Sequence, residues 1–177
     1  TKGSGPDIGI SASQDNQKLV YLQQQLLGHI WEADLTSNTS KQLTFDDRKI
    51  DGLALSPNGK RMAVVMADID PIKPGRHLFL QDRDGSNRRQ LTFGDLGASN
   101  PAWSPNGKWI SFSLRSATSG LDSSQVFLID ADNPAAPRHM GSGVRTVWVD
   151  DARFLARNVR VIPGGRTVYD EVVPIDG

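Results

Sequence analysis

The chain has 177 residues, 37% of them apolar, and its 20 basic and 20 acidic side chains give a formal net charge of zero. This composition suits one domain with a hydrophobic core, and no stretch approaches the roughly 20 apolar residues of a transmembrane helix, so no membrane insertion is expected. Balanced charge exerts no long-range attraction on nucleic acid, so no nucleic-acid partner is expected, and the absence of cysteine excludes disulfides and thiolate metal sites.

The N-terminal nine residues lack the charged and then apolar layout of a signal peptide. A mature chain from which a leader has been removed would look the same, so this feature leaves the compartment open. The first phrase with a strand pattern is SQDNQKLVYLQQ, residues 13–24, which is a weak copy of SPNGKRMAVVMA, residues 56–67.

Three phrases recur along the chain at a fixed spacing of 48 residues. QLTF at residues 42–45 returns at 90–93, and SPNGK at 56–60 returns at 104–108. The third phrase, HIWEADLTS, begins at His29 and returns as HLFLQDRDG from His77 and QVFLIDADN from Gln125. One spacing shared by three phrases indicates an internal repeat of a single supersecondary unit. A weaker copy follows at residues 147–158, where VWVDDARFLARN echoes AWSPNGKWISFS.

Within a repeat, apolar residues alternate with a period of two in short runs bounded by Gly, Pro, Asn and Asp, which is typical of β-strands. Pro57 and the Asn58-Gly59 pair predict a tight turn between the first two strands, and DRDG at residues 82–85 predicts one between the last two. Each repeat is therefore predicted to be a four-stranded antiparallel meander. In the second repeat we expect its strands at residues 52–55, 61–67, 77–81 and 88–93.

The second strand of each repeat has no charged face. Bulky side chains are predicted on one face and smaller ones on the other, with Val20, Leu22, Met62, Val64, Met66, Ile110, Phe112 and Leu114 opposite Tyr21, Ala63, Val65, Ser111 and Ser113. A sheet that turns neither face to water must lie between two other sheets. Four-stranded sheets of about 45 residues stacked around an axis form a β-propeller, so the expected fold class is all-β.

The second and third repeats resemble the TolB-type WD-like propeller repeat. The resemblance rests on residues 90–93, 101–112 and 126–130, which read QLTF, PAWSPNGKWISF and VFLID. It implies a propeller like that of periplasmic TolB, or like the non-catalytic propeller of prolyl-oligopeptidase-like proteins. It also implies a bacterial protein that is periplasmic or secreted, with a cytoplasmic location as the alternative. In the fourth repeat VDDA at residues 149–152 replaces the proline turn and departs from the pattern.

The repeats divide the chain into four predicted blades of one propeller domain or propeller fragment, at residues 8–45, 46–93, 94–141 and 142–177. The family closes its rings with six or more blades, and the fourth repeat lacks an evident outer strand after Val173. The chain is therefore a piece of a longer propeller, a compact ring closed by the N-terminal segment, or a half that pairs with a second chain. We favour a fragment or a self-associating half, because an unclosed ring exposes sheet faces and edges that recruit partners.

The topology of a meander predicts where a ligand would bind. Both short turns of a blade lie at one end, so the long connections at residues 68–76, 93–101 and 116–124 must gather at the other. Loops gathered on a rigid scaffold are a usual place for binding. We predict a partner-binding loop face at the channel mouth formed by Asp68, Asp70, Lys73, Arg76, Asp95, Asn100, Arg115 and Asp122.

The sequence predicts no catalytic residues, no metal site and no cofactor. Asp34, Asp82 and Asp130 each open a hairpin, and because the ligand spacing and closing Glu of a calcium loop are absent, we expect them to bind turn backbone. Three separated histidines do not make a triad, and no Gly-x-Ser-x-Gly elbow is present. The four tryptophans lie in or beside predicted strands, which favours packing between blades over stacking on a ligand.

Two classes of function remain. The first is a non-catalytic protein-interaction scaffold, similar to TolB, that holds a protein or peptide at the loop face or channel mouth. The second is an accessory propeller that controls substrate entry to a serine hydrolase whose catalytic domain lies outside this chain. We prefer the first because nothing in these residues requires an enzyme.

Overall fold

The structure is a computed structural model that describes residues 7–14, 17–24, 28–45, 48–67, 75–116, 120 and 123–176. These ranges form β-strands and turns without an α-helix. Accordingly, the described ranges contain no helix with the length and apolar character needed to span a bilayer.

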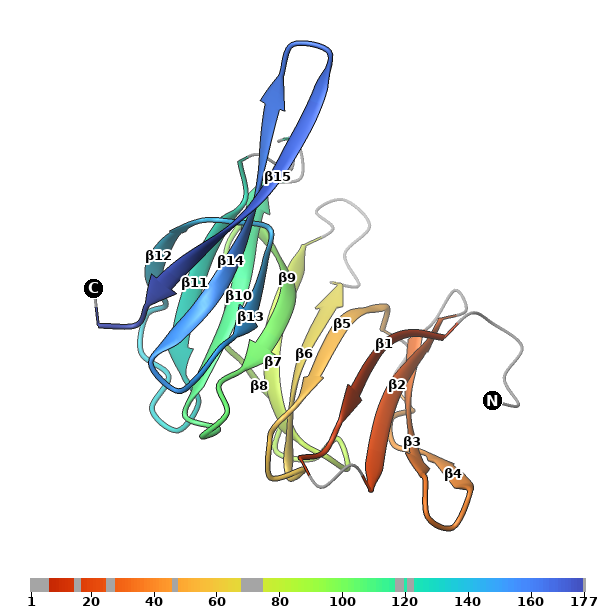
Figure 1. Cartoon of the computed structure of the whole chain (residues 1–177). Coiled ribbons are helices and arrows are strands. Elements are labelled where there is room, and N and C mark those ends of the chain that lie inside the picture. The colour runs from red at the N-terminus through yellow and green to blue at the C-terminus, as the bar shows by residue number, and fades with distance from the viewer. Residues whose placement is uncertain are drawn as a thin grey trace.

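The strands form four antiparallel sheets that follow one another along the chain (Figure 1). We call them blades 1 to 4. Blade 1 contains β1 (Asp7–Ala12), β2 (Lys18–Gln24), β3 (Gly28–Asp34) and β4 (Thr39–Gln42). Blade 2 contains β5 (Ile50–Leu55), β6 (Arg61–Ala67), β7 (Arg76–Asp82) and β8 (Arg89–Gln90). Blade 3 contains β9 (Leu96–Trp103), β10 (Trp109–Ser116), β11 (Gln125–Asp130) and β12 (Arg138–Ser142). Blade 4 contains β13 (Arg145–Trp148), β14 (Arg153–Ile162) and β15 (Gly165–Pro174).

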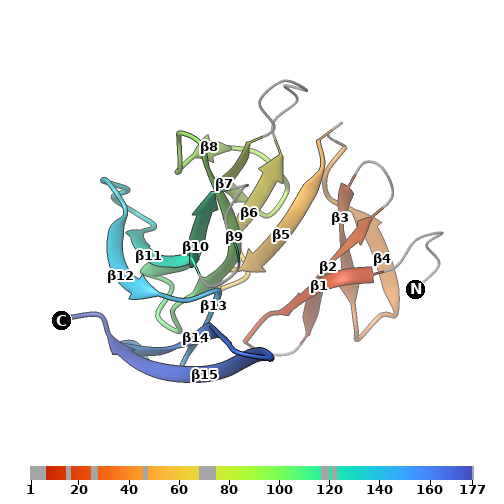
Figure 2. The same ribbon diagram turned by 90° about the horizontal axis from the view of Figure 1, so that it is seen from above.

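The four blades are arranged in an arc (Figure 2). Strands β1, β5, β9 and β13 line its inner side, while β4, β8 and β12 lie on its outer side. Blade 4 has three described strands, and its long β14–β15 hairpin extends beyond the other blades (Figure 1). The prediction of an all-β propeller built from antiparallel meanders is confirmed, and the described residues form part of a ring.

Strand positions in blade 2 follow the prediction except at its outer edge. Strand β6 is at residues 61–67 as expected, whereas the predicted strand at 88–93 is reduced to β8, Arg89–Gln90. The reason is a side chain. Thr92 Oγ1 accepts the backbone N–H of Leu78 at 2.9 Å, so the threonine hydroxyl replaces the carbonyl that would have continued the ladder.

Strand β6 is buried on both faces, as predicted. Its five central residues, Met62 to Met66, are all 0% exposed. Met62, Val64 and Met66 belong to the hydrophobic cluster shared with blade 1, and Ala63 and Val65 belong to the cluster shared with blade 3. Sheets packed on both sides have no solvent-facing side, which is what stacking around an axis requires.

The prediction for Val20 was wrong by one residue of register. Val20 packs in the same cluster as Met62 and Val64, so it faces blade 2 and corresponds to Ala63, rather than to Met62. The turn register shows why. The Ser13 N–H binds the Lys18 carbonyl as the Ser56 N–H binds the Arg61 carbonyl, both at 2.8 Å. Because both faces of these strands are apolar, alternation alone does not tell one face from the other.

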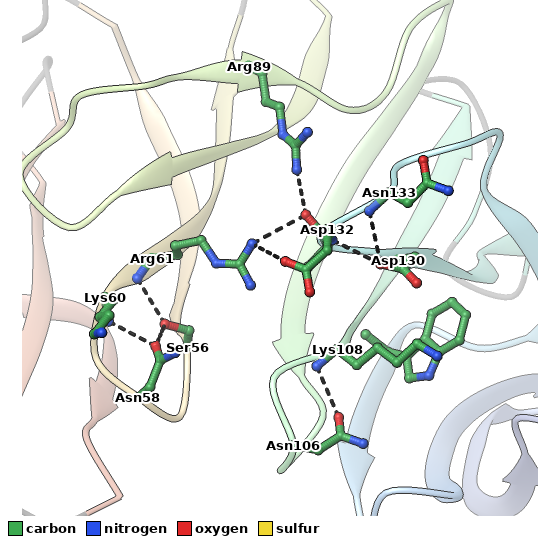
Figure 3. Close-up of polar contacts among 12 residues, drawn as sticks. Ser56, Asn58, Lys60, Arg61, Arg89, Asn106, Lys108, Asp130, Asp132 and Asn133 are labelled. Atoms are coloured by element: carbon green, nitrogen blue, oxygen red, sulfur yellow. Dashed lines mark hydrogen bonds and ion pairs between the residues drawn. The ribbon is translucent and has the colours of Figure 1, made fainter.

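The SPNGK turns are held by a repeated set of hydrogen bonds (Figure 3). The Ser56 hydroxyl accepts the N–H of Arg61 at 2.9 Å, and the Asn58 side-chain oxygen accepts the N–H of Lys60 at 3.1 Å. Ser104 and Asn106 repeat this arrangement in blade 3, where the corresponding distances are 2.9 Å and 3.0 Å. Gly59 has a φ of 68°, which a glycine adopts without strain.

Arginine and tryptophan side chains join neighbouring blades. Arg61 donates to Asp132 at 2.7 Å, and Arg89 donates to the carbonyl of Ala131, so two arginines of blade 2 hold one turn of blade 3 (Figure 3). The Trp103 indole lies 5.2 Å from the Arg61 guanidinium and donates to the Ala54 carbonyl at 3.0 Å. Trp148 makes the same kind of link from blade 4, donating to the Ala102 carbonyl at 3.3 Å.

Candidate functional site

The two ends of the blades differ in the segments that they carry. The turns after β5, β7, β9 and β11 are at one end, which we call the hairpin face. The ends of β6 and β10, the starts of β7 and β11, and the connection between β8 and β9 lie at the other end, the loop face.

A hollow of about 410 Å³ opens on the loop face between blades 2 and 3. We call it the loop-face basin. Small residues form part of its lining, namely Ala67, Gly75, Gly97, Ala98 and Ser99. Its charged lining residues are Lys49, Asp51, Arg76, Asp95 and Arg115. Small residues between charged ones leave room for a ligand's main chain near groups that can recognise its side chains.

The basin's charges are partly ordered by ion pairs. Asp51 Oδ2 lies 2.7 Å from Arg76 Nε, and Asp51 Oδ1 lies 3.1 Å from Lys49 Nζ. One carboxylate of β5 therefore holds a cation from β7 and a cation from the connection before β5. This ion pair places the half-exposed Arg76 head group next to Asp51 at the start of β7.

Three of the predicted site residues come together in this basin: Arg76, Asp95 and Arg115. Asn100 does not join them. It has a φ of 51° and donates from its side chain to the Val144 carbonyl at 2.7 Å, so it ties blade 3 to the start of blade 4. The other predicted residues, Asp68, Asp70, Lys73 and Asp122, lie outside the described residues.

Sequence reasoning missed Lys49 and Asp51. The prediction took its residues from connections expected at 68–76, 93–101 and 116–124. In the structure β9 begins at Leu96, so the connection between β8 and β9 (residues 91–95) is shorter than the one before β5 (residues 43–49). The repeat could have indicated them. Lys49 and Asp51 precede Gly97 and Ser99 by one repeat of 48 residues, and all four residues line the basin.

A second hollow, of about 420 Å³, lies on the inner side of the arc. It is lined by residues of β1, β5 and β9 and by Arg145 of β13. Ser11 and Leu55 line it too, and the Leu55 N–H donates to the Ser11 hydroxyl at 3.1 Å, which links β5 to β1. This hollow is where a propeller has its channel, and among its described lining residues one is ionisable, Arg145.

Two of the three hairpin aspartates, Asp34 and Asp130, accept hydrogen bonds from the backbone of the turns that they open. Asp34 Oδ1 accepts the N–H groups of Thr36 and Ser37, and Asp130 Oδ1 accepts those of Asp132 and Asn133. Asp82 differs from the prediction, since its carboxylate accepts the side-chain amide of Asn87 at 2.6 Å. Across the described ranges, no group of three or more His, Asp or Glu side chains could hold a metal ion.

The Asp34 carboxyl is also paired with Lys18. The Lys18 ammonium lies 2.8 Å away, and this hydrogen bond, helped by the N–H groups of Ser37 and Thr36, holds the pKa of Asp34 well below its usual value. The same contact raises the pKa of Lys18. This pair joins β2 to β3 on the hairpin face, away from the loop-face basin.

No protein-family model matches the chain, and no curated protein is similar to it in sequence. Solved structures are similar in fold. TolB from Acinetobacter baumannii matches 97% of this chain with a TM-score of 0.72 and 17% identity. A putative TolB from Agrobacterium tumefaciens matches 99% with a TM-score of 0.69 and 20% identity. An oligogalacturonate lyase in complex with manganese matches 96% with a TM-score of 0.69 and 14% identity.

The chain spans 42%, 61% and 51% of the lengths of these three structures. At such low identity the likeness concerns the fold alone, and the neighbours include an enzyme, so the fold does not choose between binding and catalysis. The stacked antiparallel blades and the two TolB structures lead to one conclusion: this chain has the fold of a TolB-type β-propeller and forms part of such a ring.

Proposed function

We propose that the chain is a non-catalytic protein-interaction scaffold that binds a protein or peptide through the loop-face basin. The observation that carries the proposal is the convergence of Arg76, Asp95 and Arg115 with Lys49 and Asp51 around one hollow of about 410 Å³. These residues come from separate strands and connections of two blades, and stacking of the blades brings them together.

The basin has the properties of a recognition site. Its volume is in the range of about 300–1,000 Å³ found for ligand sites. Arg76 begins β7, Asp51 lies in β5 and Arg115 lies in β10, so three charges are carried by paired strands. Charged groups positioned before binding cost less side-chain entropy when a partner arrives. The scaffold's proposed place is the periplasm or the exterior of a bacterial cell, on the strength of its likeness to TolB.

A selection from a random peptide library on the immobilised chain tests this proposal. The affinity of each selected peptide is then measured for the wild type and for Arg76→Glu. We expect Arg76→Glu to weaken binding at least about tenfold, because it replaces a cation of the basin with an anion beside Asp51. Asp95→Lys should also weaken binding.

Lys60→Glu is the matched control for this experiment. Lys60 is an exposed cation on the hairpin face, so the same charge reversal there leaves the basin intact. Unchanged affinity for Lys60→Glu is expected. Equal losses for Arg76→Glu and Lys60→Glu would show that only net charge matters and would contradict the proposal.

A further inference from the structure

An apolar groove of about 590 Å³ lies on the outer side of the contact between blades 2 and 3. We call it the rim groove. Its apolar lining residues include Phe93, Leu96, Leu114, Phe127, Pro134 and Pro137. Phe93 is 74% exposed and Leu96 is 44% exposed, although both are large apolar side chains. Contiguous exposed apolar surface of this kind marks interaction sites more often than single exposed side chains do.

The rim groove and the loop-face basin share one wall. Asp95 and Gly97 line the basin, while Leu96 between them lines the groove. On the neighbouring strand Arg115 lines the basin and Leu114 lines the groove. Arg115 is paired with Gly97 in the sheet, so the wall is the hydrogen-bonded junction of β9 and β10. Because successive side chains of a strand point to opposite sides, this short junction separates a charged hollow from an apolar one.

The groove has a rigid side. The Phe127 ring stacks on Phe112, with ring centroids 6.1 Å apart, and meets His139 edge-on at 5.2 Å. Phe112 is fully buried, so it fixes the Phe127 ring from beneath. Pro134 and Pro137 border the groove on the connection between β11 and β12. A large apolar side chain can enter such a groove without first rearranging it.

The charged lining of the basin favours an acidic group. Among its described residues, Lys49, Arg76 and Arg115 carry positive charge and Asp51 and Asp95 carry negative charge, which leaves an excess of one cation. An arginine fork binds a carboxylate through two parallel hydrogen bonds, which adds geometric selectivity to the electrostatic attraction.

We propose that the junction of β9 and β10 binds an extended segment of a partner protein in which a large apolar residue stands close to an acidic residue. The apolar side chain enters the rim groove, and the carboxylate enters the loop-face basin on the other side of the wall. This inference rests on the proposed binding function and names the kind of segment that is bound. Recognition then needs both halves of the segment, one for affinity and one for charge selectivity.

A synthetic peptide array tests the inference. Each peptide has a Gly-Ser frame around two variable residues, the first being Phe, Leu or Ser and the second Glu, Lys or Gln, with the number of glycines between them varied. The wild-type chain should bind the peptides that combine Phe or Leu with Glu about tenfold more tightly than those in which either residue is replaced by a neutral polar one.

Phe93→Ser and Phe45→Ser form a matched pair of variants. Phe45 occupies the position of Phe93 in the preceding copy of the QLTF phrase, is 76% exposed, and does not line the rim groove. Both substitutions replace an exposed phenyl ring, so neither should affect folding. Phe93→Ser should abolish the preference for Phe or Leu peptides, while Phe45→Ser should preserve it.

The possible results separate this inference from the proposed function. Binding that requires a Glu in the peptide and Arg76 in the chain, but shows no preference for an apolar residue in the peptide, would overturn the inference. This result would support the proposed function. A preference that survives Phe93→Ser, or is lost equally in Phe45→Ser, would also overturn the inference. Peptide binding that is indifferent to both acidity and Arg76 would contradict both. Dissociation of an oligomer by Phe93→Ser, with peptide binding unchanged, would assign the groove to contact between copies of the chain and contradict the inference.

Discussion

Two buried threonines of the repeated QLTF phrase hold the outer edges of blades 1 and 2. Thr44 Oγ1 accepts the N–H of Ile30, and Thr92 Oγ1 accepts the N–H of Leu78, each at 2.9 Å. Both threonines are 3% exposed, and Ile30 and Leu78 are 0% exposed. We expect Thr92→Val to cost about 1–3 kcal/mol, because an isosteric methyl leaves the buried N–H of Leu78 without an acceptor.

Urea denaturation measures this loss as a lower free energy of unfolding. Thr167→Val is the control, because Thr167 is an exposed threonine on β15 and its replacement should change stability by less than about 0.5 kcal/mol. A Thr92→Val loss as small as that of the control would show that the hydroxyl does not complete the edge of the sheet.

At the same scale, the lowered pKa of Asp34 predicts a pH dependence. Since the folded-state pKa lies below the unfolded one, the Lys18–Asp34 pair contributes stability above the ordinary Asp pKa of about 3.9 and loses it as the pH falls toward the folded value. The urea midpoints of the wild type and Asp34→Asn should therefore differ near neutral pH and converge in acid. A difference in urea midpoint that stays constant over this pH range would show that ionised Asp34 does not stabilise the fold through Lys18.

At the scale of the strand, the central feature is a sheet packed on both faces. Phe112 of β10 is 0% exposed and lies in the cluster between blades 2 and 3. We expect Phe112→Ala to cost about 3–5 kcal/mol, because it removes buried apolar surface and leaves a cavity between two sheets. Phe93→Ala should cost less than about 0.5 kcal/mol, since the Phe93 ring is already 74% exposed. Equal losses of stability for Phe112→Ala and Phe93→Ala in thermal denaturation would contradict the placement of Phe112 between two blades.

The same double burial limits what the sequence predicts about an element. Repeat spacing and turn residues were enough to place β6 correctly, because Pro57, Asn58 and Gly59 mark where it begins. They were not enough to orient Val20, because two apolar faces leave no polar side as a reference. The end of β8 could not be predicted from alternation either, since the Thr92 side chain, rather than its backbone, completes the pairing with Leu78.

At the scale of the whole molecule, the face of blade 4 that points away from blade 3 is exposed to solvent. Val147, Leu155 and Val172 form one row across β13, β14 and β15, and both valines are 56% exposed. On the opposite face Phe154 and Ala156 are buried against Val126 and Leu128 of blade 3. The uncovered face therefore has the apolar character that the inner blades bury.

We expect the chain to self-associate through this face at high concentration, and the double substitution Val147→Lys and Val172→Lys to reduce the association without lowering the melting temperature. Sedimentation velocity over a range of concentrations measures the self-association of the wild type and of the double variant. Identical sedimentation of the wild type and the double variant would show that this face takes no part in association.

The candidate site also belongs to this scale. The meander topology predicted the end of the molecule at which charges gather, and Arg76, Asp95 and Arg115 do meet there. Which charges share one hollow depends on how blade 2 stacks on blade 3, and local sequence does not contain that information. Asn100 shows the limit, because it stands in a predicted loop but serves as a link to Val144 of the next blade.

Nuclear Overhauser effects between side chains of neighbouring blades test the central claim, that the repeats fold into sheets stacked face to face, most directly. With selectively labelled methyl and phenyl groups, the account predicts strong cross-peaks from Val65 to the cluster that contains Phe112, and from Val20 to Met62. Cross-peaks confined to residues within a single sheet would contradict it, and the loop-face basin, which exists only where two blades meet, would have no structural basis.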